Sequence, residues 1–180
     1  MDCKDENGDT LLILAIRYSR RKAIKILLDN GADINATNQK GETALHRALI
    51  FFSKLEIVKI LVERGANINV TDNSGKTPFE NILQDKVMRP RARKYDNESM
   101  KIIEYLVGNG ADINKKSSSK EYYKGYTALH FATREFDINL LKFLIRKGID
   151  VNALNEDGNT PLIETISSVC LTPFFGQLFE

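Results

Sequence analysis

Short runs of apolar residues alternate along the whole chain with polar stretches that contain glycine. In residues 38–71, the first apolar run combines small and large side chains: Ala44, Leu45, Ala48 and Leu49. The second run consists of Ile57, Val58, Ile60, Leu61 and Val62. Both runs have the spacing of a helix with one buried face, so this stretch is predicted to form a pair of helices.

The polar stretches carry two blocks that recur with one period. The first block reads Gly-x-Thr-x-Leu/Phe and begins at Gly8, Gly41, Gly75, Gly125 and Gly158, at spacings of 33, 34, 50 and 33 residues. The second block reads Gly-Ala/Ile-Asp/Asn-Ile/Val-Asn and begins at Gly31, Gly65, Gly110 and Gly148. Two independent blocks that share a period of about 33 residues indicate a repeat protein.

The residues that recur in the blocks each have a physical role at a helix end. The threonine of the first block stands where a hydroxyl can cap a helix start, at Thr10, Thr43, Thr77, Thr127 and Thr160. Pro78 and Pro161 follow as first-turn prolines, where the missing N–H costs least. The glycine of the second block suits a left-handed residue after a helix, and the Asp/Asn-rich stretch beyond it suits a turn.

The blocks resemble the ankyrin repeat, whose signature reads roughly Gly-x-Thr-Pro-Leu-His-x-Ala and later Leu-Leu-x-x-Gly-Ala-Asp-Val-Asn. Gly41-Glu42-Thr43-Ala44-Leu45-His46-Arg47-Ala48 matches the first part closely, as does Gly125-Tyr126-Thr127-Ala128-Leu129-His130-Phe131-Ala132. The resemblance implies an all-α fold, a solenoid of five helix-pair repeats with projecting hairpin loops.

We therefore expect residues 1–180 to form a single ankyrin repeat domain. The predicted repeats cover residues 5–37, 38–71, 72–121, 122–154 and, incompletely, 155–180. In the last repeat, the first helix is predicted to run to about residue 168 and the second over 172–180. Phe174, Phe175 and Phe179 are apolar where a terminal repeat normally has a polar face, so either the parent protein continues or these rings fold back as a cap.

Two insertions interrupt the third repeat. The basic insert, residues 85–97, contains Lys86, Arg89, Arg91, Arg93 and Lys94, and Pro90 argues against a continuous helix through it. Three interpretations stay open: a solvated loop, a contact with an acidic partner, or phosphate contacts with nucleic acid or anionic lipid. The second insertion, residues 115–123, is expected to extend a hairpin tip.

Composition narrows the setting. The formal net charge is +2, from 26 basic and 24 acidic residues, which gives the whole chain no pull towards nucleic acid. Cys3 and Cys170 form no Cys-x-x-Cys pair, and no apolar run reaches the ~20 residues of a membrane span. We expect an intracellular or cytoplasmic protein, located in the host cytoplasm or nucleus if it is an effector.

Neither catalysis nor a cofactor is predicted. His46 and His130 stand in the Thr-Ala-Leu-His block, where the resemblance implies a structural hydrogen bond at the helix start. The sequence carries no Gly-rich phosphate loop, no Ser/His/Asp pattern and no dinucleotide fingerprint. We expect no enzyme, no metal, no cofactor and no small-molecule substrate.

The resemblance implies a binding surface made of the hairpin tips and the end of each first helix, which line a concave face. The candidate partner-binding residues are Arg17, Tyr18, Lys40, Glu42, Ile50, Phe51, Lys76, Tyr123, Tyr126 and Arg134, together with Arg89, Arg91, Arg93 and Lys94 of the basic insert. Tyr18, Phe51, Tyr123 and Tyr126 stand out, because aromatic side chains and arginine dominate interface hot spots.

Three functions are weighed. The first is a monomeric adaptor or host-targeting effector that binds a partner protein, in the style of ankyrin proteins of intracellular bacteria and large DNA viruses. The second is a recognition segment of a longer protein whose effector part lies outside these residues. The third is a nucleic-acid or anionic-lipid binder that uses the basic insert, which the near-neutral charge disfavours.

Overall fold

The computed structural model describes residues 3–50, 54–88, 97–118 and 123–170, of which 85–88, 97 and 167–170 are described as backbone only. The described residues form α-helices and no strand. The helices are α1 (Leu11–Arg17), α2 (Arg21–Asp29), α3 (Ala44–Ile50), α4 (Leu55–Glu63), α5 (Pro78–Met88), α6 (Asn97–Gly108), α7 (Ala128–Arg134), α8 (Ile138–Arg146) and α9 (Pro161–Cys170). The chain divides into two compact units, Met1–Asp112 and Ile113–Glu180, which we describe separately as unit 1 and unit 2.

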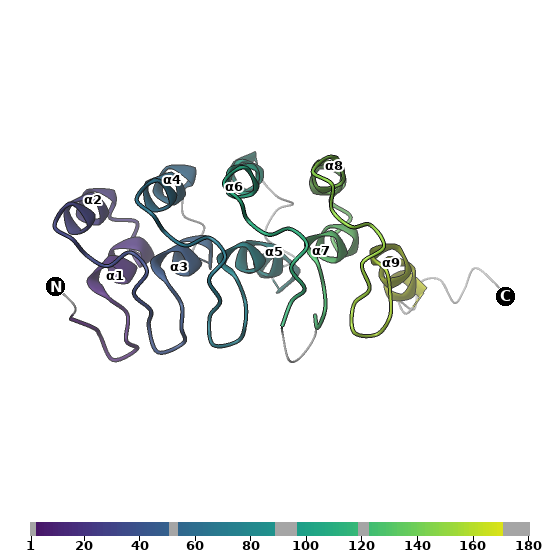
Figure 1. The fold of residues 1–180 in the computed structure, drawn as a ribbon, viewed down its shortest axis with the longest axis horizontal. Helices are drawn as coiled ribbons and strands as arrows, with labels where there is room; N and C mark the ends of the chain where they lie inside the picture. Colours follow the sequence, from purple (N-terminus) through teal and green to yellow (C-terminus); the bar gives the residue numbers. More distant parts are fainter. Residues whose placement is uncertain (1–2, 51–53, 89–96, 119–122, 171–180) are drawn as a thin grey trace. The chain divides into compact units, whose positions relative to one another are not determined.

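Unit 1 consists of three helix pairs. Helix α1 packs on α2, α3 on α4 and α5 on α6, while α1 contacts α3, α3 contacts α5 and α4 contacts α6. The first helices of the pairs lie side by side in one layer and the second helices in another, and hairpin loops project from the first layer (Figure 1). This arrangement of stacked helix pairs with projecting loops confirms the predicted fold class.

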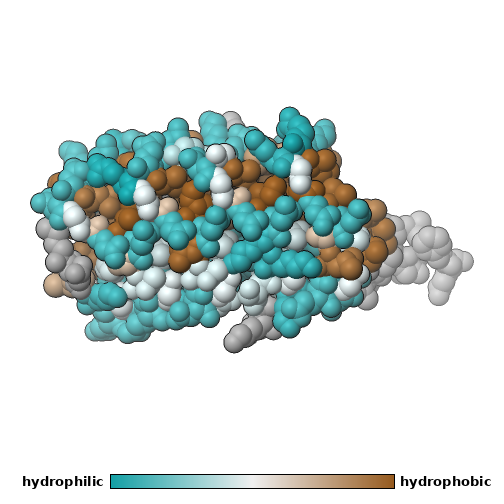
Figure 2. All heavy atoms as spheres, viewed as in Figure 1, coloured by the Kyte–Doolittle hydropathy of each residue, from teal (hydrophilic) through white to brown (hydrophobic). Residues whose placement is uncertain are grey.

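The core of unit 1 lies between the two helix layers. Its largest fully buried side chains are Leu12, Ile13, Ile16, Ile24, Leu45, Leu61, Phe79, Leu83, Ile103 and Leu106. These residues recur at helical spacing in both helices of a pair, as the apolar pattern predicted. On the face shown in Figure 2, hydrophobic residues gather between the layers and hydrophilic residues cover the second helices and the hairpin tips.

Unit 2 contains the pair α7 and α8 and a further helix, α9, which packs on α7. Phe131 of α7 and Leu140 of α8 are fully buried. Helix α9 begins at Pro161, as predicted, and ends at Cys170. The second helix predicted over residues 172–180 lies outside the described residues.

The threonines begin the first helices as expected. The Thr10 hydroxyl accepts the N–H of Ile13 at 3.3 Å, and the Thr77 hydroxyl accepts the N–H of Glu80 at 3.2 Å. In the return direction, the Glu80 carboxylate accepts the N–H of Thr77 at 2.7 Å. This reciprocal pair satisfies two backbone donors that a helix start would leave without partners.

The glycines of the second block end the second helices. Gly31, Gly65, Gly110 and Gly148 all have φ between +78° and +90°. In α2, the N–H of Gly31 donates to the Leu28 carbonyl at 3.1 Å and that of Ala32 to the Leu27 carbonyl at 3.0 Å. Because a side chain disfavours this left-handed conformation, glycine is the residue expected there.

Asparagines at the end of the same block join one repeat to the next. The Asn35 side chain accepts the N–H of Asn67 at 2.9 Å and donates to the Gly65 carbonyl at 3.3 Å. In unit 2, the Asn114 side chain accepts the N–H of Asp150 at 3.0 Å. The amide side chain thus pairs backbone groups at a helix end that no helix hydrogen bond reaches.

The third repeat differs from the others in its first helix. Helix α5 has 11 residues, whereas α1, α3 and α7 have 7 each. Four residues of the basic insert, 85–88, therefore lengthen a helix, where the sequence suggested a region between helices. Helix α5 is described to Met88, two residues before Pro90.

Candidate functional site

The hairpin tips of successive repeats are tied together by their backbones. In unit 1, the N–H of Gln39 donates to the Asn7 carbonyl at 3.2 Å, and the N–H of Asn73 donates to the Lys40 carbonyl at 2.9 Å. In unit 2, the N–H of Glu156 donates to the Lys124 carbonyl at 3.3 Å. The tips therefore use these backbone groups internally, in contacts with the neighbouring tip.

The glycines of the first block permit this close approach. A Cβ atom on Gly41 would lie 2.8 Å from the backbone N of Asn73, and one on Gly125 would lie 2.7 Å from the backbone N of Glu156. Both glycines also have a positive φ, +74° and +75°. A side chain there would strain the backbone and push neighbouring tips apart.

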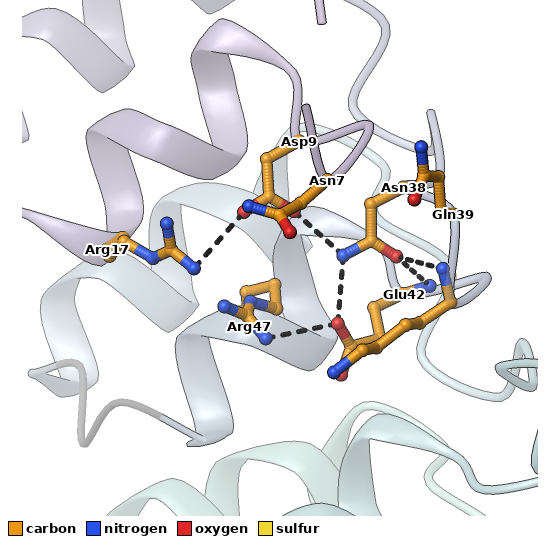
Figure 3. Close-up of a pocket in the computed structure, with 8 residues that line it drawn as sticks. Asn7, Asp9, Arg17, Asn38, Gln39, Glu42 and Arg47 are labelled. Carbon is orange, nitrogen blue, oxygen red and sulfur yellow. Dashed lines mark hydrogen bonds and ion pairs between the residues drawn. The ribbon is translucent and has the colours of Figure 1, made fainter. Parts of the chain in front are cut away.

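A polar network lies where the first two tips of unit 1 meet α1 and α3 (Figure 3). We call it the Asn38 cluster, and its members are Asp9, Arg17, Asn38, Glu42 and Arg47. The Asn38 amide donates to the Asp9 carboxylate at 2.8 Å and to the Glu42 carboxylate at 2.8 Å. The Asn38 side-chain oxygen accepts the N–H groups of Lys40 at 2.9 Å and Glu42 at 3.0 Å.

Two arginines balance the two carboxylates of this cluster. Arg47 donates to Glu42 at 3.1 Å, and both side chains are buried. Arg17 pairs with Asp9 at 3.5 Å, where the Arg17 side chain is 31% exposed and that of Asp9 is 1% exposed. Because the acids lie beneath and the Arg17 guanidinium reaches the surface, a molecule that approaches meets the cation first.

A pocket opens at this network. Its lining consists of Asn7, Asp9, Arg17, Asn38, Gln39, Lys40, Glu42 and Arg47. Asn7, Gln39 and Lys40 are exposed at the tips. All of the lining residues thus have polar or charged side chains, with the acids buried and Asn7, Gln39 and Lys40 exposed.

Unit 2 carries a second network, the Glu164 cluster, made of Tyr126, Arg134, Asn155, Asn159 and Glu164. Glu164 accepts hydrogen bonds from the Tyr126 hydroxyl, from Asn155 at 3.2 Å and from Asn159 at 3.0 Å. Arg134 pairs with Glu164 at 3.8 Å. Burial opposes ionisation of Glu164, but these hydrogen bonds outweigh it and lower the pKa of the carboxyl group.

The aromatic members of unit 2 are packed rings. Burial, followed by the hydrogen bond to Glu164, raises the pKa of the Tyr126 hydroxyl. The Tyr126 ring lies 5.3 Å from that of Tyr123 and 5.4 Å from that of Phe131. The guanidinium of Arg134 lies 5.5 Å from the centre of the Tyr123 ring. These side chains thus form one cluster of aromatic rings and charged groups.

The predicted binding residues occupy three kinds of position. Tyr18, which is 64% exposed, and Lys40 lie on the surface, while Arg17, Ile50, Lys76 and Arg134 are partly buried. Glu42, Tyr123 and Tyr126 are buried. Phe51 and, in the basic insert, Arg89, Arg91, Arg93 and Lys94 lie outside the described residues.

The burial of Tyr123, Tyr126 and Glu42 corrects the expectation that these side chains project from the tips. Tyr126 is 3% exposed because its ring turns inward to its aromatic neighbours and its hydroxyl bonds to Glu164. Glu42 turns inward because Asn38 and Arg47 both donate to it. A polar or aromatic residue after the block's glycine thus has a partner in its own unit.

Sequence reasoning did not select Asn38, Arg47, Asn155 or Glu164. Asn38 and Asn155 each stand three residues before a block glycine, Gly41 and Gly158. Arg47 and Glu164 each stand six residues after one. Opposite charges in the same register of two repeats were the available signal, since a charged residue on the inner helix needs a partner.

His46 and His130 have the structural role that was expected. The Nδ1 atom of His46 accepts the N–H of Thr43 at 3.1 Å, so its Nε2 atom carries the proton and donates to the Lys76 carbonyl at 3.0 Å. His130 makes the same pair with Thr127 at 3.2 Å and with the Asn159 carbonyl at 3.1 Å. Burial lowers the pKa of both imidazoles.

The described residues contain neither a metal-ligand cluster nor a membrane-spanning helix. Within those residues, no three His, Cys, Asp or Glu side chains gather as metal ligands would. No helix in the same part of the chain is long and apolar enough to cross a bilayer. Cys3 is a free, exposed thiol.

Comparison with known proteins agrees with the geometry. A family profile described as ankyrin repeats (3 copies) matches residues 1–72 and 92–171. The chain is 28% identical over 174 residues to protein glp-1 of Caenorhabditis elegans, a match that covers 94% of this chain and 12% of glp-1. It is 30% identical over 168 residues to the neurogenic locus notch homolog protein 1 of Mus musculus, covering 88% of this chain and 6% of that protein.

A shorter match is viral. Over 80 residues the chain is 32% identical to an ankyrin repeat protein of fowlpox virus, covering 44% of this chain and 40% of that protein. The chain thus spans less than half of the length of each of these relatives. The matched profile covers most of the chain, and the described repeats have its helix-pair geometry, so the chain belongs to the ankyrin repeat family.

Proposed function

We propose that this chain binds a partner protein through its hairpin tips and the exposed ends of its first helices. Ankyrin repeats are in general protein–protein interaction modules, which supports the proposal. The observation that carries it is the arrangement at the first two tips of unit 1. There the neighbouring backbones already pair with each other, while Arg17 and Lys40 present charge at one pocket.

The tips suit recognition because glycines and Asn38 fix their conformation. The exposed side chains that a partner would contact are not needed to hold it. Gly8 and Gly41 allow the close backbone approach, and Asn38 holds its own tip through the N–H groups of Lys40 and Glu42. The surface therefore loses little conformational entropy when a partner binds, which favours affinity.

Affinity capture from cell lysate with matched charge variants tests the proposal. Lys40→Glu reverses an exposed charge at the pocket, and Lys22→Glu makes the same change on the exposed face of α2 in the other helix layer. The proposal expects a captured protein that is depleted with Lys40→Glu and retained with Lys22→Glu. Equal capture by both variants would reject the tip surface as the binding site.

The setting of this binding is also a proposal. An intracellular adaptor is our first expectation, and the similarity to a fowlpox virus protein supports a host-targeting effector as one form of it. A second candidate function, a recognition segment of a longer protein, is favoured by the small share of glp-1 and Notch 1 that the match covers. An immunoblot separates the two, because a free-standing chain would migrate near 20.4 kDa.

A further inference from the structure

We propose that the outer face of α2 and α4 in unit 1 binds the surface of a bilayer that carries anionic phospholipids. We call it the basic face, and it is made of residues 20–30 and 54–64, the two helices with their capping residues. These helices lie in the layer of second helices, away from the hairpin tips (Figure 1). The inference goes beyond the proposed function, because it concerns a different surface and a different kind of partner.

Charge is distributed unevenly over unit 1. The stretches that form the hairpin tips, residues 4–10, 31–43 and 65–77, contain three cations and six acids. The basic face has three acids, Asp29, Glu56 and Glu63, and seven cations: Arg20, Arg21, Lys22, Lys25, Lys54, Lys59 and Arg64. The near-neutral total of the chain therefore conceals one surface with a net charge of 7 − 3 = +4, and the local potential is what attracts a charged partner.

Two acids of the basic face join its two helices. Glu56 of α4 pairs with Arg21 of α2, and Asp29 of α2 pairs with Arg64 at 2.8 Å. Four further cations are exposed and form no ion pair with a described residue: Arg20, Lys22, Lys25 and Lys54. Their charge is available to an anionic partner.

Helix α2 also presents an apolar side chain among these cations. Ile24 is buried on the side of the helix that packs on α1, whereas Ile26 is 61% exposed. Because residues three and four apart share one side of a helix, Lys22 lies beside both Lys25 and Ile26. A basic helix surface that includes an exposed apolar side chain is suited to the interface between headgroups and acyl chains.

Ile26 favours a bilayer over a soluble polyanion. A nucleic acid or an acidic peptide would pair with the lysines but would give this side chain no apolar environment. A bilayer offers anionic headgroups to the cations and the acyl boundary to the isoleucine. Each cation near such a surface contributes about fivefold in affinity, so a net charge of +4 corresponds to an apparent Kd of about 1 mM in accessible lipid.

Co-sedimentation of the 180-residue chain with lipid vesicles tests the proposal. Vesicles of phosphatidylcholine that contain about one third phosphatidylserine are compared with vesicles of phosphatidylcholine alone. We expect binding to the serine-lipid vesicles at about 0.1 M salt and its loss at about 1 M, where the screening length falls to about 3 Å. The vesicles without anionic lipid should bind no chain.

Variants locate the binding surface. Lys22→Gln and Lys25→Gln should each weaken vesicle binding about fivefold. Lys40→Gln is the matched control, because it removes the same charge from an exposed tip residue and should leave vesicle binding unchanged. Ile26→Ser keeps every charge and should weaken vesicle binding about threefold. All four residues are exposed, and thermal unfolding checks that each variant keeps its fold.

Soluble polyanions provide the competing outcome. Polyglutamate or oligothymidylate, added at the same concentration of negative charge as the accessible lipid, should displace less than half of the bound chain. Displacement of more than half by either one overturns the proposal, as does the absence of binding to serine-lipid vesicles or equal binding to both kinds of vesicle. So does an equal loss with Lys40→Gln and Lys25→Gln, or unchanged binding with Ile26→Ser.

The proposed function fails or holds independently of this result. Lys40→Glu should lose protein capture and keep vesicle binding, whereas Lys22→Glu should keep protein capture and lose vesicle binding. The two charge reversals therefore separate the tip surface from the basic face.

Discussion

The Asn38 cluster of unit 1 and the Glu164 cluster of unit 2 occupy the same five positions of the repeat. The pairs are Asp9 and Tyr126, Arg17 and Arg134, Asn38 and Asn155, Glu42 and Asn159, and Arg47 and Glu164. Both asparagines accept two backbone N–H groups of their own tip, from Lys40 and Glu42 in one case and from Asp157 and Asn159 in the other. This part of the tip is common to both units.

The remaining positions differ in charge. In unit 1 the acids are Asp9 and Glu42, and the inner helix supplies Arg47. In unit 2 the inner helix supplies the acid, Glu164, and its neighbours are neutral donors and Arg134. One tip backbone thus supports two unlike polar networks, which is how a single repeat design can offer different surfaces to partners.

The largest expected effect breaks what the two regions share. Gly41→Ala in unit 1 and Gly125→Ala in unit 2 would each place a Cβ atom within 2.8 Å of the next tip's backbone, in addition to left-handed strain. We expect each to cost ~3 kcal/mol or more, measured by urea denaturation.

Matched controls separate the clash from the strain. Gly65 and Gly148 have the same left-handed conformation, but a Cβ atom there would meet nothing within 4 Å. Gly65→Ala and Gly148→Ala should therefore cost only ~1 kcal/mol each. Equal losses of unfolding free energy at all four positions would show that the clash with the neighbouring tip adds nothing to the cost of the substitution.

A smaller effect should distinguish the clusters. Asn38→Ala removes two acceptor bonds and leaves the buried carboxylates of Asp9 and Glu42 without their shared donor, at a cost of about 3 kcal/mol. Asn155→Ala removes the same acceptor bonds but only one bond to a carboxylate, at a cost of about 2 kcal/mol. Urea denaturation, with hydrogen exchange of peptides from each unit, measures both.

A double-mutant cycle sharpens this difference. In an Asp9→Asn background, Asn38→Ala should cost less than in the natural chain, because one of the two carboxylates that need the donor is gone. An unchanged cost would show that the bond between Asn38 and Asp9 contributes no coupling energy.

The fold could be predicted from the sequence because its determinants are local. Thr10 and Gly31 each set one helix end through hydrogen bonds within a few residues, Pro161 sets another through its fixed φ, and the apolar spacing sets which face is buried. The burial of Tyr126 could not, because it is decided by a residue of the following repeat, and that of Glu42 depends on which of its near neighbours turn towards it. Arg47 draws Glu42 inward, and Glu164, 38 residues away, holds Tyr126.

Acid should weaken both units in the same way. Burial lowers the pKa of His46 and His130 below the ordinary value of about 6.5, so the unfolded chain takes up protons first as the pH falls. The stability that the neutral imidazoles contribute is then fully present above about pH 6.5 and is lost as the pH falls from there through their lowered pKa values in the folded chain. Protonation also adds a proton to Nδ1, the atom that accepts the N–H of Thr43 or Thr127 in the neutral ring, so this hydrogen bond is lost.

Urea denaturation at pH 7.5 and 5.5 measures this loss, and His46→Gln and His130→Gln are the variants that assign it. Each variant should be less stable than the natural chain at pH 7.5 and should show a smaller drop on acidification. If the drop is undiminished in both variants, other groups carry the acid sensitivity, and the shared threonine–histidine pair contributes no pH dependence.

The smallest expected effect concerns the turn inside a helix pair, where the units again differ. Ser19 in unit 1 and Phe136 in unit 2 both have left-handed φ, 51° and 52°. Asparagine tolerates this conformation better than a bulky aromatic residue does. Since Phe136 is 59% exposed and has limited contact to lose, Phe136→Asn should stabilise unit 2 by about 0.5 kcal/mol in thermal or urea unfolding.

Ile138→Asn is the control. Ile138 is similarly exposed, at 62%, but it lies in helix α8, so the same substitution should destabilise the unit there. A gain at both positions would point to a general effect of removing exposed apolar surface, whereas a gain at Phe136 alone would show that unit 2 carries backbone strain at a position where the flanking chain fixes the turn.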